Sequence, residues 1–466
     1  MSFSCDLGGQ RFRFASVKTV LAKANEEKAG DNLAGIGAAS ELERVAAKQV
    51  LSQMSLTTLR EHPVVPADKD AVTRLIDQSI DAVVWEKIQS WTVADLREYL
   101  LCELPDCSEP SPEAVGRALN GEMAAAVAKL MSNLDLVRAA KRLRVVATAN
   151  TTLGQNGVLG ARLQPNHPAD STEGIIASIY EGLSYGVGDA VIGINPVYDT
   201  PESVSRLLHA TDRLIDELGV PTQNCVLSHI TTQMRAIEAG APSGLIFQSI
   251  AGTEKGNTAF GINIEMLQEA KELGLRHCKN TGGKPMYFET GQGSELSSRS
   301  HNDADQVTLE ARCYALARCF DPFLVNDVCG FIGPEYLADG RQMIRAGLED
   351  HFMGKLLAVP MGIDACYTNH MDADQNDLEN LAMLLVAGGV NYFMGVPMGD
   401  DVMLSYQTTS YHDIASLREL MNCRPAPEFS AWLEEHGLMR DGKLTAKAGD
   451  AAYIAEMRRS TSSCTG

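Results

Sequence analysis

The chain has 466 residues, of which 40 are basic and 60 acidic, giving a formal charge of −20 and a sequence pI near 4.9. Nucleic acids and anionic membrane surfaces attract basic faces, so this balance argues against both as partners. Hydrophobic residues make up 45% of the chain, which is enough for a sizeable core and excludes wholesale disorder. No apolar run reaches the roughly 18 residues of a membrane helix, and the start of the chain lacks the plan of a secretory signal.

The cysteines indicate the compartment. There are eleven, an odd number, and none forms a C-x-x-C pair. Neither a zinc ribbon nor a disulfide framework is indicated, so we expect small buried side chains in a reducing, cytoplasmic environment.

The first 140 residues predict helices. Apolar residues recur at helical spacing in Leu42–Met54, Ala71–Trp85 and Val115–Met131. We therefore expect residues 1–140 to form a helical N-terminal region.

Beyond residue 140, short apolar runs alternate with amphipathic stretches. Near-continuous apolar strands separated by helices predict a parallel sheet that is buried on both faces. Eight such units over about 250 residues fit a (β/α)8 TIM barrel over residues 141–423, and a doubly wound α/β sheet is the structural alternative. The eight runs are Leu143–Ala149, Ala190–Asn195, Cys225–His229, Gly244–Ile250, Met286–Glu289, Phe323–Val328, Leu356–Asp364 and Val390–Met394.

The last part of the chain, residues 424–466, predicts a short helical tail. Within it we expect Arg458–Gly466 to be disordered.

Polar residues gather where these strands end. Barrels of this kind place their chemistry at the carboxyl ends of their strands, so these residues are the candidates for a site. A polar residue at a strand end can also simply cap the next helix. They are Arg162 and Gln164 in the loop after the first strand, then Asn195, His229, Gln248, Ser249, Glu289, Asn326, Asp327 and Asp364.

A metal-dependent hydrolase or lyase is one interpretation of these residues. Glu289, Asp364 and His229 lie near strand ends and could hold a divalent cation. Against it, the histidines do not cluster and no H-x-H pair occurs on an early strand. A second motif, Glu289-Thr-Gly-Gln-Gly-Ser294, ends a strand with a carboxylate and continues in a loop whose free N–H groups could bind a phosphate or a nucleoside.

Longer blocks of the chain resemble one family closely. The similarity runs from about Phe12 to Tyr453, and blocks of this length are far more specific than a three-residue motif. They resemble the large subunit of ethanolamine ammonia-lyase in EGLSYGVGDAVIGINPV, GLIFQSI, YFETGQGSELS, GFIGPEYL, QMIRAGLEDHFMGKL and MGDDVMLSYQTT.

The resemblance implies an adenosylcobalamin-dependent radical lyase that converts ethanolamine to acetaldehyde and ammonia by hydrogen abstraction and amine migration. It implies a (β/α)8 barrel, with the cobalamin over the barrel mouth between this chain and a small subunit. The cofactor keeps its own base on cobalt in this family, so we predict no metal ligand from the protein, and Glu349-x-His351-x-x-Gly354 is only a near match to a cobalt-ligating motif.

The resemblance also implies roles for individual residues. Glu289, Asp364 and Gln164 would hold the substrate ammonium group, while Arg162 and Asn195 would hold its hydroxyl; Arg162, Glu289 and Asp364 would be catalytic. These residue types suit substrate binding, because carboxylates pair with a cation and a fixed guanidinium stabilises charge on oxygen. The implied cofactor-facing residues are Pro196, Gln248, Ser249, Phe260, Ser297, Val328, Phe331, Met394 and Met403.

The resemblance finally implies a hexamer of heterodimers housed in a bacterial microcompartment. A catalytically silent packing protein is the remaining alternative. Such a protein should have lost Arg162 or Glu289, and both are present.

Overall fold

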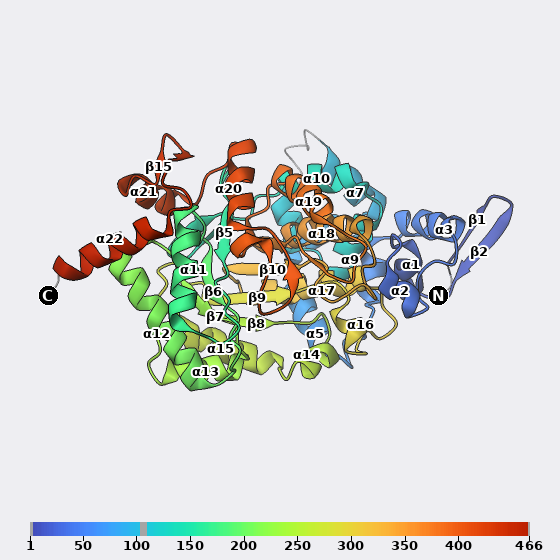
Figure 1. Ribbon diagram of the computed structural model, residues 1–466. Helices are drawn as coiled ribbons and strands as arrows, with labels where there is room; N and C mark the ends of the chain where they lie inside the picture. Colours follow the sequence, from blue (N-terminus) through green and yellow to red (C-terminus); the bar gives the residue numbers. More distant parts are fainter. Residues whose placement is uncertain (1–2, 103–109, 465–466) are drawn as a thin grey trace.

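The computed structural model describes residues 3–102 and 110–464, with side chains to residue 460. An N-terminal hairpin and the last helix lie at opposite ends of the molecule, with a sheet of parallel strands between them (Figure 1). No helix in the described ranges has both the length and the apolar character needed to cross a membrane.

The N-terminal region is helical, as predicted, except at its start. There β1 (Phe3–Leu7) and β2 (Gln10–Phe14) form an antiparallel hairpin that the sequence analysis missed. Gly8 and Gly9, both at positive φ, make the two-residue turn, so the signal was available. Ten helices follow: α1 (Val17–Ala24), α2 (Ala29–Leu33), α3 (Glu41–Ser52), α4 (Leu56–Glu61), α5 (Ala71–Gln78), α6 (Ala82–Ile88), α7 (Val93–Leu101), α8 (Pro112–Arg117), α9 (Gly121–Lys129) and α10 (Asn133–Arg142).

Two of the predicted helices are each split in two. The side chain of Asp81 accepts hydrogen bonds from the first N–H groups of α6, and Asn120 does the same for α9. An N-cap of this kind starts a new helix, which the apolar spacing alone did not reveal.

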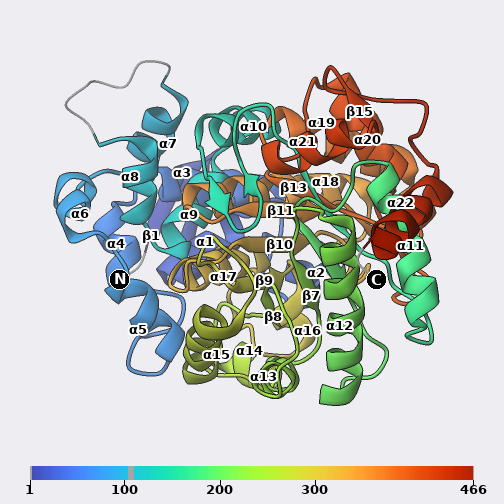
Figure 2. The same ribbon diagram turned by 90° about the vertical axis from the view of Figure 1, so that its left-hand side faces the viewer.

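Eight parallel strands form the centre of the molecule. They pair in the order β7-β6-β5-β13-β11-β10-β9-β8, and the N–H groups of Gly244 and Leu245 donate to the carbonyl of Asn224 across the remaining gap. The sheet is therefore a nearly closed (β/α)8 barrel, as predicted (Figure 2). The strands are β5 (Gly160–Leu163), β6 (Val191–Ile194), β7 (Asn224–Val226), β8 (Ile246–Ser249), β9 (Met286–Thr290), β10 (Leu324–Val328), β11 (Met361–Asp364) and β13 (Tyr392–Gly395).

The first predicted strand was wrong. Residues 143–149 do not enter the barrel: Ala147–Thr148 is β3, which pairs with β4 (Thr152–Leu153). Carbonyls of this segment accept from Asn391, just before β13, and from Thr281, before β9, so it covers the amino-terminal end of the barrel. The true first strand is β5, where the buried Arg162 interrupts a short apolar run and hides it from a hydropathy pattern.

Helices surround the barrel, and α9 and α10 of the N-terminal region pack on α17 and α18. Both of these barrel helices are consequently buried almost all round. The outer helices are α11 (Thr172–Ser184), α12 (Pro201–Leu218), α13 (Ile230–Glu238), α14 (Glu254–Ala259), α15 (Ile264–His277), α16 (Ser294–Ser297), α17 (Gln306–Arg318), α18 (Gly340–Leu356), α19 (Gln375–Ala387) and α20 (Tyr411–Leu420).

The last part of the chain packs beside the barrel. Arg458, which we expected in a disordered end, lies in a helix and donates to Glu217 and to the Tyr180 hydroxyl, so the disorder prediction was wrong for the residues described.

The remaining elements are β12 (Tyr367–Thr368), the 3-10 turn η1 (Pro397–Gly399), β14 (Tyr406–Gln407), α21 (Pro427–Glu435), β15 (Met439–Arg440), β16 (Lys443–Leu444) and α22 (Ala451–Cys464).

Candidate active site at the barrel mouth

Arg162 lies inside the barrel on β5 itself, not in the loop after it as we expected. Its side chain is fully buried, and Nη1 donates to the Tyr287 hydroxyl at 2.8 Å and to Glu289 Oε2 at 3.4 Å. A Cβ at Gly193 would lie 2.8 Å from Arg162 Nε, so a glycine on the neighbouring strand leaves room for the guanidinium. Burial opposes the charged form, but Tyr287 and Glu289 together raise the Arg162 pKa, so the group stays cationic.

Glu289 stands at the rim of the same site. Its side chain is 19% exposed, and its carboxylate accepts hydrogen bonds from Asn326 Nδ2, at 3.2 Å, and from Arg162. Burial raises the pKa of Glu289 more than Arg162 and Asn326 lower it. The carboxylate thus has a neighbouring cation and still faces the mouth.

Asp364 ends β11 beside these groups. Thr408 donates to its Oδ1, and burial raises its pKa to about 7 despite that bond. The charge of Glu289 also raises the pKa of Asp364 and that of Arg162 lowers it, so the three groups lie close enough to influence one another.

Gln164 follows β5 and is fully buried. Its Nε2 donates to Asp401 Oδ2 at 2.6 Å and to the Tyr406 hydroxyl at 3.2 Å. Asn166 also donates to Asp401 Oδ2, at 2.7 Å, and its Oδ1 accepts from the Asn195 N–H. The half-buried Asn195 is thereby linked to Gln164 through two side chains.

Several buried polar atoms in this site have no hydrogen-bond partner among the described residues. An unsatisfied buried polar group costs about 1–3 kcal/mol, so a small polar ligand that bonds several of these atoms at once would be stabilised there. The set combines two donors with three acceptors. The atoms are Arg162 Nε and Nη2, Gln164 Oε1, Asn326 Oδ1 and Asp364 Oδ2.

Apolar side chains lie next to the polar site. Val328, Cys366 and Tyr406 form a small cluster separate from the main core, with Phe331 and Leu404 packed against it. The ring centroids of Phe331 and Tyr406 are 5.2 Å apart, and the Tyr406 hydroxyl donates to Met394 Sδ at 3.3 Å. The N–H of Met403 donates to Asp401. The structure therefore brings Val328, Phe331 and Met394 of the predicted cofactor-facing set together around Tyr406, and it places the backbone of Met403 beside Asp401.

The other predicted cofactor-facing residues are more dispersed. Ser249 is in register with Glu289 on the neighbouring strand. Gln248 uses both ends of its amide on the backbone, accepting from Ile230 N–H and donating to the Ser249 carbonyl. Pro196 and Phe260 are half-buried, and the exposed Ser297 donates to a carbonyl of its own helix α16.

Asp327 faces away from the barrel interior. It alternates with Asn326 along β10, and the carboxyls that act on it most strongly are Asp350 of α18 and Glu310 of α17, ahead of Asp364. Burial and these two carboxyls raise its pKa well above the ordinary value. It belongs to the helix layer and not to the mouth.

The structure does not support the metal site. His229 caps α13 through a contact with Thr231. Within the described ranges, no three His, Cys, Asp or Glu side chains are grouped so that they could hold a metal ion, and Glu289, Asp364 and His229 do not form such a group.

Sequence reasoning missed five residues that shape the site. Tyr287 could have been found, because it is two residues before Glu289 on one strand and so shares its face. Asn166, Asp401, Tyr406 and Thr408 come from loops and β14, where no periodicity indicates which side chains turn inward.

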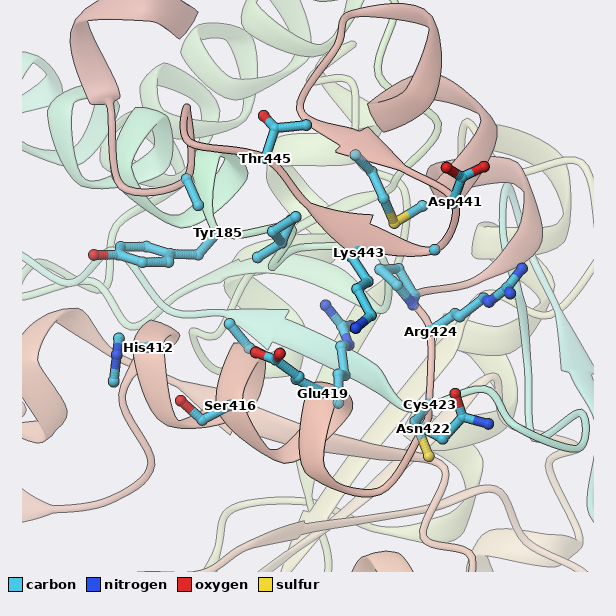
Figure 3. A pocket seen from close by; sticks show the side chains of 17 residues that line it. Tyr185, His412, Ser416, Glu419, Asn422, Cys423, Arg424, Asp441, Lys443 and Thr445 are labelled. Atoms are coloured by element: carbon cyan, nitrogen blue, oxygen red, sulfur yellow. The ribbon is translucent and has the colours of Figure 1, made fainter.

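A second cavity, of about 330 Å³, lies elsewhere (Figure 3). Residues of α20 and of the β15–β16 hairpin line it, and it contains none of the predicted site residues. The carbonyl of Arg424, in its wall, accepts from Leu159 just before β5 begins. This cavity therefore lies toward the amino-terminal end of β5, whereas the candidate site lies at the carboxyl end.

A (β/α)8 barrel with a charged, buried site at the carboxyl ends of its strands is the architecture of barrel enzymes. The family model described as "Ethanolamine ammonia lyase large subunit" matches residues 12–447. The chain is 54% identical to the ethanolamine ammonia-lyase large subunit of Escherichia coli (strain K12) over 454 residues, which are 97% of this chain and 100% of that protein. It is 53% identical, with the same coverage, to the ethanolamine ammonia-lyase large subunit of Salmonella typhimurium. The chain belongs to the ethanolamine ammonia-lyase large subunit family.

Proposed function

We propose that this chain is the large subunit of an adenosylcobalamin-dependent lyase that converts ethanolamine to acetaldehyde and ammonia. The observation that carries the proposal is the set of unpartnered atoms inside the barrel. Ethanolamine has an ammonium group that only donates hydrogen bonds and a hydroxyl that can accept them. The set offers a partner for each end.

The ammonium end fits the acceptors. Gln164 Oε1 and Asp364 Oδ2 are free to accept, and Glu289 adds a carboxylate at the rim. An ionised carboxylate gains from a nearby cation, so ammonium binding favours the charged forms of Glu289 and Asp364, which burial disfavours in the empty site.

The hydroxyl end fits Arg162. Its Nε and Nη2 donors are free while Nη1 is held by Tyr287 and Glu289, so the guanidinium is fixed in place. A fixed cationic donor stabilises negative charge that develops on oxygen as the amine leaves its carbon. Asn195, at the end of β6, is the second residue we assign to this end.

Residues at the mouth suit a large, partly apolar cofactor. The cluster of Val328, Phe331 and Tyr406 lies beside the polar site, and exposed apolar side chains follow the ends of β6 and β13. Met394 and Met403 complete the surface that we assign to the cofactor. When bound, adenosylcobalamin supplies the hydrogen-atom abstraction that side chains cannot perform. Buried walls keep water from the substrate.

We also propose the partners and the setting. A small subunit would complete the cobalamin site, in a hexamer of heterodimers within a bacterial microcompartment of the cytoplasm. Nine cysteines in the described part of the chain are free thiols, as a reducing compartment would leave them.

Glu289→Gln tests the proposal in the complex with the small subunit. Turnover of ethanolamine should fall at least about 100-fold, because the neutral amide no longer attracts the ammonium group or balances Arg162. Cobalamin binding, followed by its absorbance, should stay within about twofold of the parent. Glu419→Gln, an exposed carboxylate in the second cavity, is the control (Figure 3). Parent-like turnover of Glu289→Gln would contradict the assigned role.

A further inference from the structure

Asp401 is a buried carboxylate between η1 and β14, and its side chain is not among the groups assigned above to the substrate or the cofactor. It is 3% exposed, and both oxygens accept hydrogen bonds. Oδ1 accepts from the backbone N–H groups of Met403 and Leu404, within its own loop. Oδ2 accepts from the side-chain amides of Gln164, at 2.6 Å, and Asn166, at 2.7 Å.

These bonds determine which way the Gln164 amide points. A carboxylate accepts but cannot donate, so only the NH2 end of Gln164 can face Asp401. The same NH2 group also donates to Tyr406, which uses its second hydrogen. Oε1 is left as a buried acceptor with no partner among the described residues.

Asp401 orients the Asn166 amide in the same way. Its NH2 group faces Asp401, so its Oδ1 is free to accept from the Asn195 N–H at 2.9 Å. One carboxylate thereby orients two amides and, through the second, fixes the start of the loop after β6.

We infer that Asp401 is a positioning residue that makes Gln164 present a carbonyl oxygen, and not an amide NH2, to the ligand in the barrel. The inferred ligand group is a hydrogen-bond donor, and its reading as the substrate ammonium rests on the proposed function. A reversed Gln164 amide would place N–H donors against that cation and repel it.

Asp401→Asn is the sharp test, because the loop fixes how the new amide sits. Its oxygen must take the Oδ1 place, facing the N–H groups of Met403 and Leu404, so its NH2 replaces Oδ2. That NH2 meets the NH2 ends of Gln164 and Asn166, and Gln164 can restore a bond only by turning its carbonyl away from the ligand. The shape of the side chain is otherwise kept.

Steady-state kinetics of the cobalamin-loaded complex provide the first readout. In Asp401→Asn we expect the KM for ethanolamine to rise about tenfold, with kcat changed less than about threefold. In a Gln164→Leu background, which has no amide to turn, adding Asp401→Asn should change KM by less than about twofold. Asp441→Asn, an exposed carboxylate in the second cavity, should leave KM unchanged (Figure 3).

A neutron crystal structure provides a readout that needs no activity. The parent should show the deuterium atoms of Gln164 directed at Asp401 and Tyr406, and the variant should show them directed into the barrel. A KM within twofold of the parent, an equal rise in the Gln164→Leu background, or an unturned amide would overturn the inference. A parent complex that makes no acetaldehyde would instead refute the proposed function, while the neutron density still decides the orientation of Gln164.

Discussion

Arg162 and Glu289 differ in how much freedom the fold leaves them. The guanidinium is sealed between β5, β9 and the small residue Gly193, whereas the carboxylate keeps part of its surface at the mouth. A sealed cation whose donors are only partly used is costly in an empty site and becomes favourable when a ligand oxygen arrives. We therefore expect the role of Arg162 to depend on where its N–H donors are placed and not on its charge alone.

Arg162→Lys separates these two contributions. Lysine keeps the positive charge but loses the planar fork, so it cannot contact Tyr287, Glu289 and a ligand oxygen at once. We expect kcat of the complex to fall roughly 100-fold in the acetaldehyde assay. Arg424→Lys, in the second cavity, is the matched control and should behave like the parent (Figure 3). Activity near that of the parent would contradict the two-donor role.

Asp364 predicts a pH dependence. Its pKa is raised to about 7, mainly by burial, so below that pH the empty site holds a neutral acid that attracts an ammonium group weakly. We expect kcat/KM for ethanolamine to rise with pH through about 7 and then level. Asp364→Asn should lower kcat/KM and remove this rise. If the same rise persists in the variant, another group is responsible for it.

At the scale of elements, buried ion pairs join the N-terminal helices to the barrel. Lys28, the N-cap of α2, bonds Glu349 of α18 at 2.8 Å, and both side chains are fully buried. Arg345, one turn earlier in α18, bonds the other oxygen of Glu349 at 2.7 Å. Burial acts to raise the Glu349 pKa, but Lys28 and Arg345 lower it to about 2. Glu349 thus has a structural role, and the neighbouring His351 is buried as a neutral ring whose pKa burial lowers.

Lys28→Met tests this junction. Removing one partner leaves Glu349 with Arg345 alone, so we expect the free energy of unfolding, from urea titration at pH 7, to fall by about 3 kcal/mol. Because Lys28 favours the ionised Glu349, the difference from the parent should be full above about pH 4.5 and shrink as pH falls toward 2.

Lys279→Met is the control for that measurement. Lys279 is 49% exposed and pairs with Asp212 at the surface, so its loss should cost less than about 1 kcal/mol. Equal losses in the two variants would show that the buried pair does not hold the junction.

At the scale of the whole molecule, the mouth of the barrel carries exposed apolar side chains. Apolar side chains are exposed on the loops that follow β6 and β13: Val197, Tyr198, Met398 and Val402. Apolar side chains that are exposed together can mark a surface that binds a ligand or a partner. We propose that the cofactor and the small subunit cover these side chains. We also propose that the chain is divided into a helical region (residues 1–140), a catalytic barrel (residues 141–423) and a C-terminal tail (residues 424–466).

The purified chain alone should therefore be almost inactive. We expect its ethanolamine turnover with added adenosylcobalamin to be roughly 100-fold below that of the complex, because part of the cofactor site is missing. Adding the small subunit should restore it in a saturable titration. Full activity without a second chain would contradict the assignment.

The sequence by itself determined the architecture and the family. Seven of the eight barrel strands could be read from apolar runs, because strands buried on both faces need apolar residues at nearly every position. The missed strand, β5, is the one whose inward position carries Arg162, so the site residue itself disrupted the pattern. The hairpin β1–β2 left its signal in two glycines, whereas Leu143–Ala149 is apolar for a different reason, since it covers the end of the barrel.

Only the tertiary structure decided which polar residues meet. Strand ends predicted Glu289 and Asp364 as candidates, because parallel strands place their carboxyl ends at one edge. Asp401 and Thr408 come from loops far along the chain, and their partners, Gln164 and Asp364, are fixed by contacts that no local spacing encodes. The direction of a side-chain amide is set by the acceptor it faces, and that acceptor is known only when the chain has folded.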